Sequence, residues 1–183
     1  MSDSVIDPRF LEIFPTWLNT LGKDAAAVGE ALAVHSQDEA HGDIGRYLTA
    51  GLNYIFKSLD LIPDGIDDLG FLDDAFVLRI AAQLATAEQP DAREGAIGRL
   101  AGEADAVKDF LGADYVRLET YVRALRKGAA RGRTVEDIMT DADTRTTFLQ
   151  EVGAWGEHYQ VPSFTRDMKT LIKLRAFLSA KLA

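Results

Sequence analysis

Near its middle the chain reads Asp60-Leu61-Ile62-Pro63-Asp64-Gly65-Ile66-Asp67-Asp68-Leu69-Gly70-Phe71-Leu72-Asp73-Asp74, a stretch that we call the acidic turn. It contains six aspartates and no lysine, arginine or histidine. Its Pro63-Asp64-Gly65 tripeptide is typical of a turn, because proline fixes a backbone angle, aspartate bonds nearby backbone and glycine accepts a positive φ. We therefore expect a short connection between two elements here.

The segments on either side of the acidic turn both have a helical pattern. Before it, apolar residues recur every three or four positions, which is the spacing of one helix face. After it, they occupy nearly every side of a helix, as expected of a helix that is surrounded. The positions are Ile44, Tyr47, Leu48, Leu52, Ile55 and Leu59, then Phe71, Leu72, Ala75, Phe76, Val77, Leu78, Ile80, Ala81 and Leu84. We predict a helical hairpin whose second helix is central.

Helical patterns also fill the remainder of the chain. Residues 10–21 carry an apolar helical face, but Pro15 lacks an amide hydrogen, so we expect a kink or two short helices there. Thr134-Val135-Glu136-Asp137 resembles a capping box that begins another helix. No long apolar and polar alternation predicts a strand. The fold class is therefore all-α, a single globular domain of about seven to nine helices. It comprises N-terminal helices (1–40), the hairpin (41–90) and a C-terminal part (91–183).

Composition restricts the function. The 183 residues are 47% hydrophobic and 27% charged, as in an ordinary globular protein, and no cysteine is present, which excludes disulfides and thiolate chemistry. The net charge of −9 argues against binding nucleic acid or an anionic membrane with the whole surface. No signal peptide is visible, and no run of about 20 clean apolar residues could span a membrane. We expect a soluble, cytoplasmic protein.

The carboxylates of the acidic turn have two interpretations, which the sequence leaves open. Aspartates in and before the first turn of a helix cap it and interact with its dipole, which is a purely structural role. Crowded carboxylates also repel one another unless a cation lies between them, and Mg²⁺, Mn²⁺ or Ca²⁺ takes such ligands. The match to an EF-hand fails, because Ile62 and Phe71 stand where ligands are needed. The candidate metal ligands are Asp60, Asp64, Asp67, Asp68, Asp73 and Asp74.

Two stretches near the C-terminus are basic. Residues 117–133 and 166–181 each carry a surplus of positive charge, and either could face the acidic turn or a partner. Lys169, Lys173 and Arg175, in the last helix, are our candidate partner-binding residues. The three histidines have no metal-ligand spacing, and no hydrolase, phosphate-binding or dinucleotide motif is present, so the sequence identifies no catalytic or cofactor-binding residue.

One resemblance to a known family involves the acidic turn. Tyr54-Ile55-Phe56-Lys57-Ser58-Leu59-Asp60-Leu61-Ile62-Pro63-Asp64, followed by Leu69-Gly70-Phe71-Leu72-Asp73-Asp74-Ala75, resembles the YkvA-like family, a bacterial domain of unknown function. The likeness covers residues of about 44–84. It implies a helical hairpin and supplies no catalytic residues. Gly65-Ile66-Asp67-Asp68 departs from the family pattern, in which many members have an apolar residue and a second proline.

These observations favour a non-enzymatic protein-interaction or scaffold module, with another protein or a second copy of itself as its partner. The alternative is a divalent-cation-binding protein or metal-dependent hydrolase that uses the acidic turn. A third possibility is peripheral attachment to membranes through the basic last helix.

Overall fold

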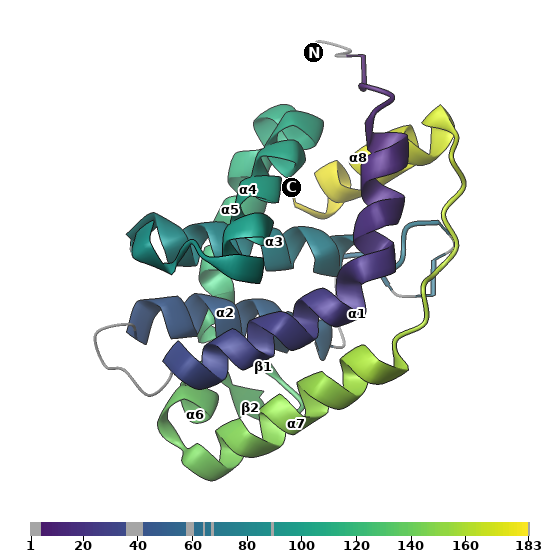
Figure 1. Ribbon diagram of the computed structural model, residues 1–183. Coiled ribbons are helices and arrows are strands. Elements are labelled where there is room, and N and C mark those ends of the chain that lie inside the picture. The colour runs from purple at the N-terminus through teal and green to yellow at the C-terminus, as the bar shows by residue number, and fades with distance from the viewer. Residues whose placement is uncertain are drawn as a thin grey trace.

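The computed structural model describes residues 5–35, 42–57, 61–63, 65–66, 68–88 and 90–182. The prediction of an all-α domain is confirmed (Figure 1). In chain order, the described elements are α1 (Phe10–His35), α2 (Gly42–Ile55), α3 (Leu72–Glu88), the 3₁₀-helix η2 (Pro90–Ala92), α4 (Gly95–Leu111), η3 (Gly112–Asp114), α5 (Tyr115–Ala124), η4 (Leu125–Lys127), β1 (Ala129–Ala130), β2 (Arg133–Thr134), α6 (Val135–Thr140), α7 (Ala142–His158) and α8 (Met168–Lys181).

Helix α3 is the centre of the molecule. It packs between α2 and α4, and α1 crosses the same group of helices (Figure 1). Every residue from Leu72 to Ala82 is buried, including Asp73, Asp74 and Arg79. The predicted hairpin with a central second helix is therefore present, and the all-round apolar pattern was the signal for it.

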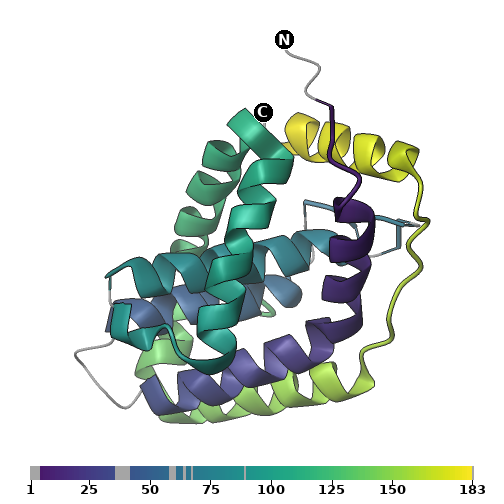
Figure 2. The same cartoon turned by 45° about the horizontal axis from the view of Figure 1, so that its top comes forward.

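Helix α1 is one helix that contains Pro15. It changes direction strongly along its length, as both ribbon views show (Figures 1 and 2). Proline removes one backbone hydrogen bond and its ring crowds the preceding turn, so a bend is the expected result. The alternative of two separate helices is wrong, because α1 continues through Pro15.

Residues 129–134 form a minimal β-hairpin. Strands β1 and β2 pair antiparallel, with Ala129 opposite Thr134 and Ala130 opposite Arg133. Arg131 and Gly132 both have positive φ, 51° and 76°, which suits a two-residue hairpin turn. Two-residue strands are too short to show an alternation, which is why the sequence did not predict them. The capping box that follows is confirmed: Thr134 Oγ1 accepts from the Asp137 amide at 3.0 Å, and Asp137 accepts from the Thr134 amide at 2.9 Å.

An extended segment, residues 159–167, leads from α7 to α8 and passes along one side of the molecule (Figure 1). Its Arg166 forms an ion pair with Glu12 of α1 at 2.9 Å. Helix α8 then buries Leu171, Leu174 and Leu178. The C-terminal part therefore packs on the same core as the hairpin.

Candidate functional site

The first polar site surrounds Asp73, at the start of α3. This side chain is buried, and its Oδ2 accepts hydrogen bonds from the Tyr54 hydroxyl at 2.6 Å and from the Ile62 amide at 3.2 Å. The Tyr54 oxygen also accepts from the Leu61 amide at 2.8 Å. Burial, followed by the charge of Asp73, raises the pKa of Tyr54 far above its ordinary value. Tyr54 therefore remains a donor, and the pair fixes residues 61–62 against the two helices of the hairpin.

Asp68 has a different role. Its φ is 66°, and its Oδ1 accepts from both the amide and the hydroxyl of Thr165, at 2.7 and 2.9 Å. These Asp68 bonds reach the extended segment, 97 residues away in the sequence. Asp67 lies outside the described residues. The acidic turn is thus attached to the C-terminal part of the chain.

The cation interpretation stays a prediction. Asp60, Asp64 and Asp67 lie outside the described residues, while Asp73 and Asp74 are buried in the first turn of α3. Within the described part of the chain, no group of three or more His, Asp or Glu side chains is arranged to hold a metal ion. The bonds of Asp68 and Asp73 described above join separate parts of the fold, and the two Asp68 bonds go to the extended segment and not to the first turn of α3.

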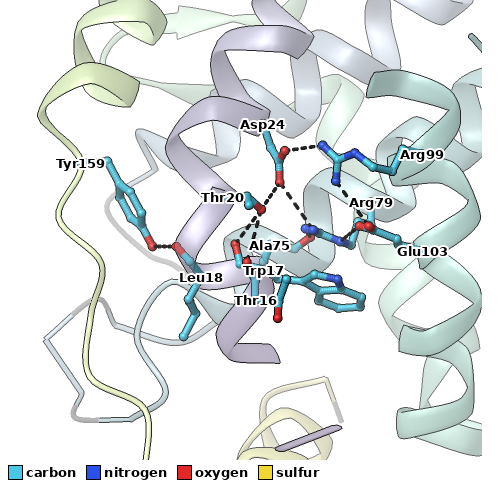
Figure 3. Close-up of polar contacts among 10 residues, drawn as sticks. All are labelled: Thr16, Trp17, Leu18, Thr20, Asp24, Ala75, Arg79, Arg99, Glu103 and Tyr159. Carbon is cyan, nitrogen blue, oxygen red and sulfur yellow. Dashed lines mark hydrogen bonds and ion pairs between the residues drawn. The ribbon is translucent and has the colours of Figure 1, made fainter. Parts of the chain in front are cut away.

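A second polar site, which the sequence did not reveal, lies between α1, α3 and α4 (Figure 3). Its centre is Arg79, whose side chain is fully buried. The guanidinium donates to Glu103 at 2.8 Å, to the Ala75 carbonyl at 3.0 Å and to Asp24 at 3.5 Å. It also lies over the ring of Trp17, 4.0 Å from the ring centroid. The signal for this site in the sequence was Arg79, an arginine with apolar neighbours in the central helix.

Arg99 completes this network, which we call the Arg79 network. Arg99 bonds Asp24 at 2.5 Å and Glu103 at 3.3 Å, and Thr20 donates to Asp24 at 2.8 Å (Figure 3). Burial lowers the pKa of Arg79 to about 10, while the charges of Glu103 and Asp24 act in the opposite direction. Arg79 therefore stays protonated at neutral pH. Two carboxylates balance two guanidiniums, so the network holds three helices together without a surplus of charge.

A third polar site is a basic groove of about 550 Å³, lined by Arg46, Arg126, Lys127, Thr134 and Glu136. Arg46 of α2 pairs with Glu136 of α6 at 2.5 Å. Arg126 lies over the ring of Tyr47 at 4.6 Å and donates from Nε to the Arg123 carbonyl at 3.2 Å. Among the described residues, no carboxylate forms an ion pair with Arg126 or Lys127. The groove therefore presents two unbalanced positive charges.

The candidate partner-binding residues of α8 do not share one environment. Lys169 and Lys173 are exposed, whereas Arg175 is half-buried. Burial of the Asp114 carboxyl acts to raise its pKa, but hydrogen bonds from Arg117 and Ser179 and the charges of Arg117 and Arg175 lower it overall. Arg175 therefore interacts with the rest of the protein, and Lys169 and Lys173 remain available to a partner.

An aromatic groove of about 480 Å³ lies where α7 meets the extended segment, and its lining includes Phe71, Trp155 and Tyr159. The ring centroids of Trp155 and Tyr159 are 5.1 Å apart, and the Tyr159 hydroxyl donates to the Leu18 carbonyl at 2.7 Å (Figure 3). Trp17 is buried, but Trp155 is only half-buried at the edge of this groove.

Comparisons with models of protein families, with curated proteins and with solved structures found no match. The resemblance to the YkvA-like family stays a prediction. Among the described residues, no helix is both long enough and apolar enough to cross a membrane.

Proposed function

We propose that this protein is a non-enzymatic helical module that binds an acidic segment of another protein in its basic groove. The observation that carries the proposal is the position of Arg126 and Lys127. Both line a groove in a chain with a net charge of −9, and neither has an ion-pair partner among the described residues. Charge complementarity of this kind guides association and selects partners.

The environment of the other charged groups supports a binding role rather than catalysis. The Arg79 network is balanced, and the Asp73 and Asp68 bonds connect parts of the fold to one another. Structural ion-pair networks of this kind also shift pKa values, so the shift of Arg79 needs no catalytic explanation. The basic groove differs, because Lys127 and the Arg126 amino groups have no acceptor among the described residues and can bind a ligand from outside the chain.

The net charge favours a short acidic segment over a long polyanion. Nucleic acid or an anionic membrane extends far beyond the groove and meets the repulsion of the acidic surface as a whole. A short segment of protein experiences mainly the local field of the groove, because charges beyond about 8 Å are screened at physiological ionic strength. The exposed Lys169 and Lys173 of α8 form a second, separate basic surface, which serves as a matched comparison.

A short polyglutamate peptide with a fluorescent label tests the proposal. We expect binding that weakens as salt is added, that is lost in the double variant Arg126→Glu and Lys127→Glu, and that is retained in Lys169→Glu and Lys173→Glu. Both double variants reverse two charges, so the comparison isolates position from net charge. Absence of binding to the unmodified protein, or equal loss in both variants, would rule out the groove as the binding site.

A further inference from the structure

The donors of the basic groove suggest which acidic group occupies it. Arg46 is already bonded to Glu136, which leaves Arg126, Lys127 and Thr134. The Thr134 oxygen accepts from the Asp137 amide, and its own proton has no acceptor within the described part of the chain. Three donor groups therefore line the same groove, and two of them are cations.

Arg126 is held in a fixed orientation for such a ligand. Its Nε–H is used by the Arg123 carbonyl, and the face of its guanidinium lies over Tyr47. The amino groups at the end of the guanidinium have no acceptor among the described residues, so they can donate as a pair. A planar guanidinium that is oriented in advance binds a carboxylate or a phosphoryl group through two parallel hydrogen bonds.

A carboxylate and a phosphoryl group differ in the number of negative charges that they carry. A carboxylate carries one negative charge and would neutralise only one of the two cations, Arg126 and Lys127. A phosphoryl group on a side chain carries about −1.5 to −2 at pH 7 and offers three acceptor oxygens, which matches two cations and the Thr134 hydroxyl. Asp137, the carboxylate next to Glu136 in the sequence, accepts from the Thr134 amide in the capping box and forms no ion pair with Arg126 or Lys127 among the described residues.

We propose that the occupant of the basic groove is a phosphorylated segment of a partner protein, with the phosphoryl group bound by Arg126, Lys127 and Thr134. This inference rests on the proposed function, because it specifies the acidic group at the same site. It makes the interaction dependent on phosphorylation of the partner.

Titration of the phosphoryl group gives a signature that a carboxylate lacks. Its second pKa is about 6, so the ligand loses most of its second negative charge as the pH falls from 7.5 to 5.5. Within the groove, the hydrogen bond from Arg46 lowers the pKa of Glu136, so this carboxylate stays ionised over the same range. Binding of a phosphorylated peptide should therefore weaken with acidification, while binding of a glutamate peptide should not.

The test uses three peptides that differ only at their central residue, which is phosphoserine, glutamate or serine. Fluorescence anisotropy measures their affinity for the full chain, for Arg126→Gln with Lys127→Gln, and for Lys169→Gln with Lys173→Gln. We expect the phosphoserine peptide to bind about tenfold more tightly than the glutamate peptide, as charge-assisted hydrogen bonds imply. The preference should disappear in the groove variant and persist in the α8 variant. Lys127→Gln alone, at an exposed position, keeps the test valid if the double variant is unstable.

Each outcome has a distinct meaning. Equal affinity for the phosphoserine and glutamate peptides at both pH values would overturn this inference and leave the proposed function standing. Failure of both peptides to bind would overturn both. Tighter binding to single-stranded DNA, or to vesicles that contain a phosphorylated lipid, would overturn the assignment to a protein segment.

Discussion

The Arg79 network and the basic groove contain similar side chains in opposite situations. In the network, Arg79 and Asp24 are buried, and two guanidinium and two carboxylate groups are balanced and bonded to one another. In the groove, Arg126 and Lys127 are accessible, and no carboxylate pairs with them within the described residues. A balanced buried cluster stabilises the fold and cannot accept a ligand without losing its own bonds. An unbalanced cluster in contact with solvent contributes little to stability and can bind.

The largest expected effect is on the Arg79 network. Arg79→Met should lower the free energy of unfolding by about 3–5 kcal/mol, because Asp24 loses its buried partner and Glu103 loses its closest one. Arg99→Met is the matched control, since Arg99 contacts the same two carboxylates but its side chain is 45% exposed. Its cost should be about 0.2–1 kcal/mol. Urea denaturation measures both, and equal costs would contradict the structural role of Arg79.

The next effect concerns the acidic turn. Tyr54→Phe removes the donor to Asp73 and the acceptor of the Leu61 amide, so it should cost about 1–3 kcal/mol. Asp68→Asn is the comparison within the same turn, because Asp68 is only partly buried and bonds Thr165 near the surface. It should cost less than Tyr54→Phe in the same denaturation assay. The opposite order would mean that the attachment to the extended segment, rather than the Tyr54–Asp73 pair, holds the turn.

A smaller effect on the free energy of unfolding is expected at alkaline pH, where Tyr115 ionises. Burial, followed by the charges of Glu119 and Asp105, raises the pKa of Tyr115 from 10.0 to about 12. Above pH 10 the unfolded chain ionises this tyrosine before the folded protein does, so its contribution to stability is lost as the pH rises to about 12. The stability difference between the unmodified protein and Tyr115→Phe should therefore narrow over this window. A constant difference would show that Tyr115 ionises equally in both states.

The smallest effect is expected for divalent cations. The account assigns structural bonds to Asp68 and Asp73, so adding Mg²⁺, Mn²⁺ or Ca²⁺ to chelator-treated protein should leave the unfolding midpoint unchanged. A saturable rise that disappears in Asp73→Asn would instead support a cation site in the acidic turn, since a ligand that binds only the folded state stabilises it. Sodium chloride at matched ionic strength is the control.

The fold was predictable where one segment contained the whole signal. The apolar pattern after Phe71 identified the central helix α3, and the capping box beginning at Thr134 was found in place. Each of these features depends on residues within a few positions of one another. Apolar periodicity and capping patterns were therefore sufficient to predict them.

The candidate sites were less predictable, because their residues come from distant parts of the chain. Arg46 and Glu136 are 90 residues apart, and Asp24 and Arg79 are 55 apart. The sequence identified the basic stretch 117–133, but not that Arg123 pairs with Glu119 while Lys127 lines a groove. The side chains of the basic groove come together through the packing of α2, η4 and α6.

The most direct test of the central comparison is an NMR titration of isotope-labelled protein with the phosphoserine peptide. The account predicts shifts in the signals of Arg126, Lys127 and Thr134, while the Arg79 side-chain signal stays unchanged because its network is already complete. Shifts confined to Lys169 and Lys173, or a shift of Arg79 without any change at the groove, would contradict the account.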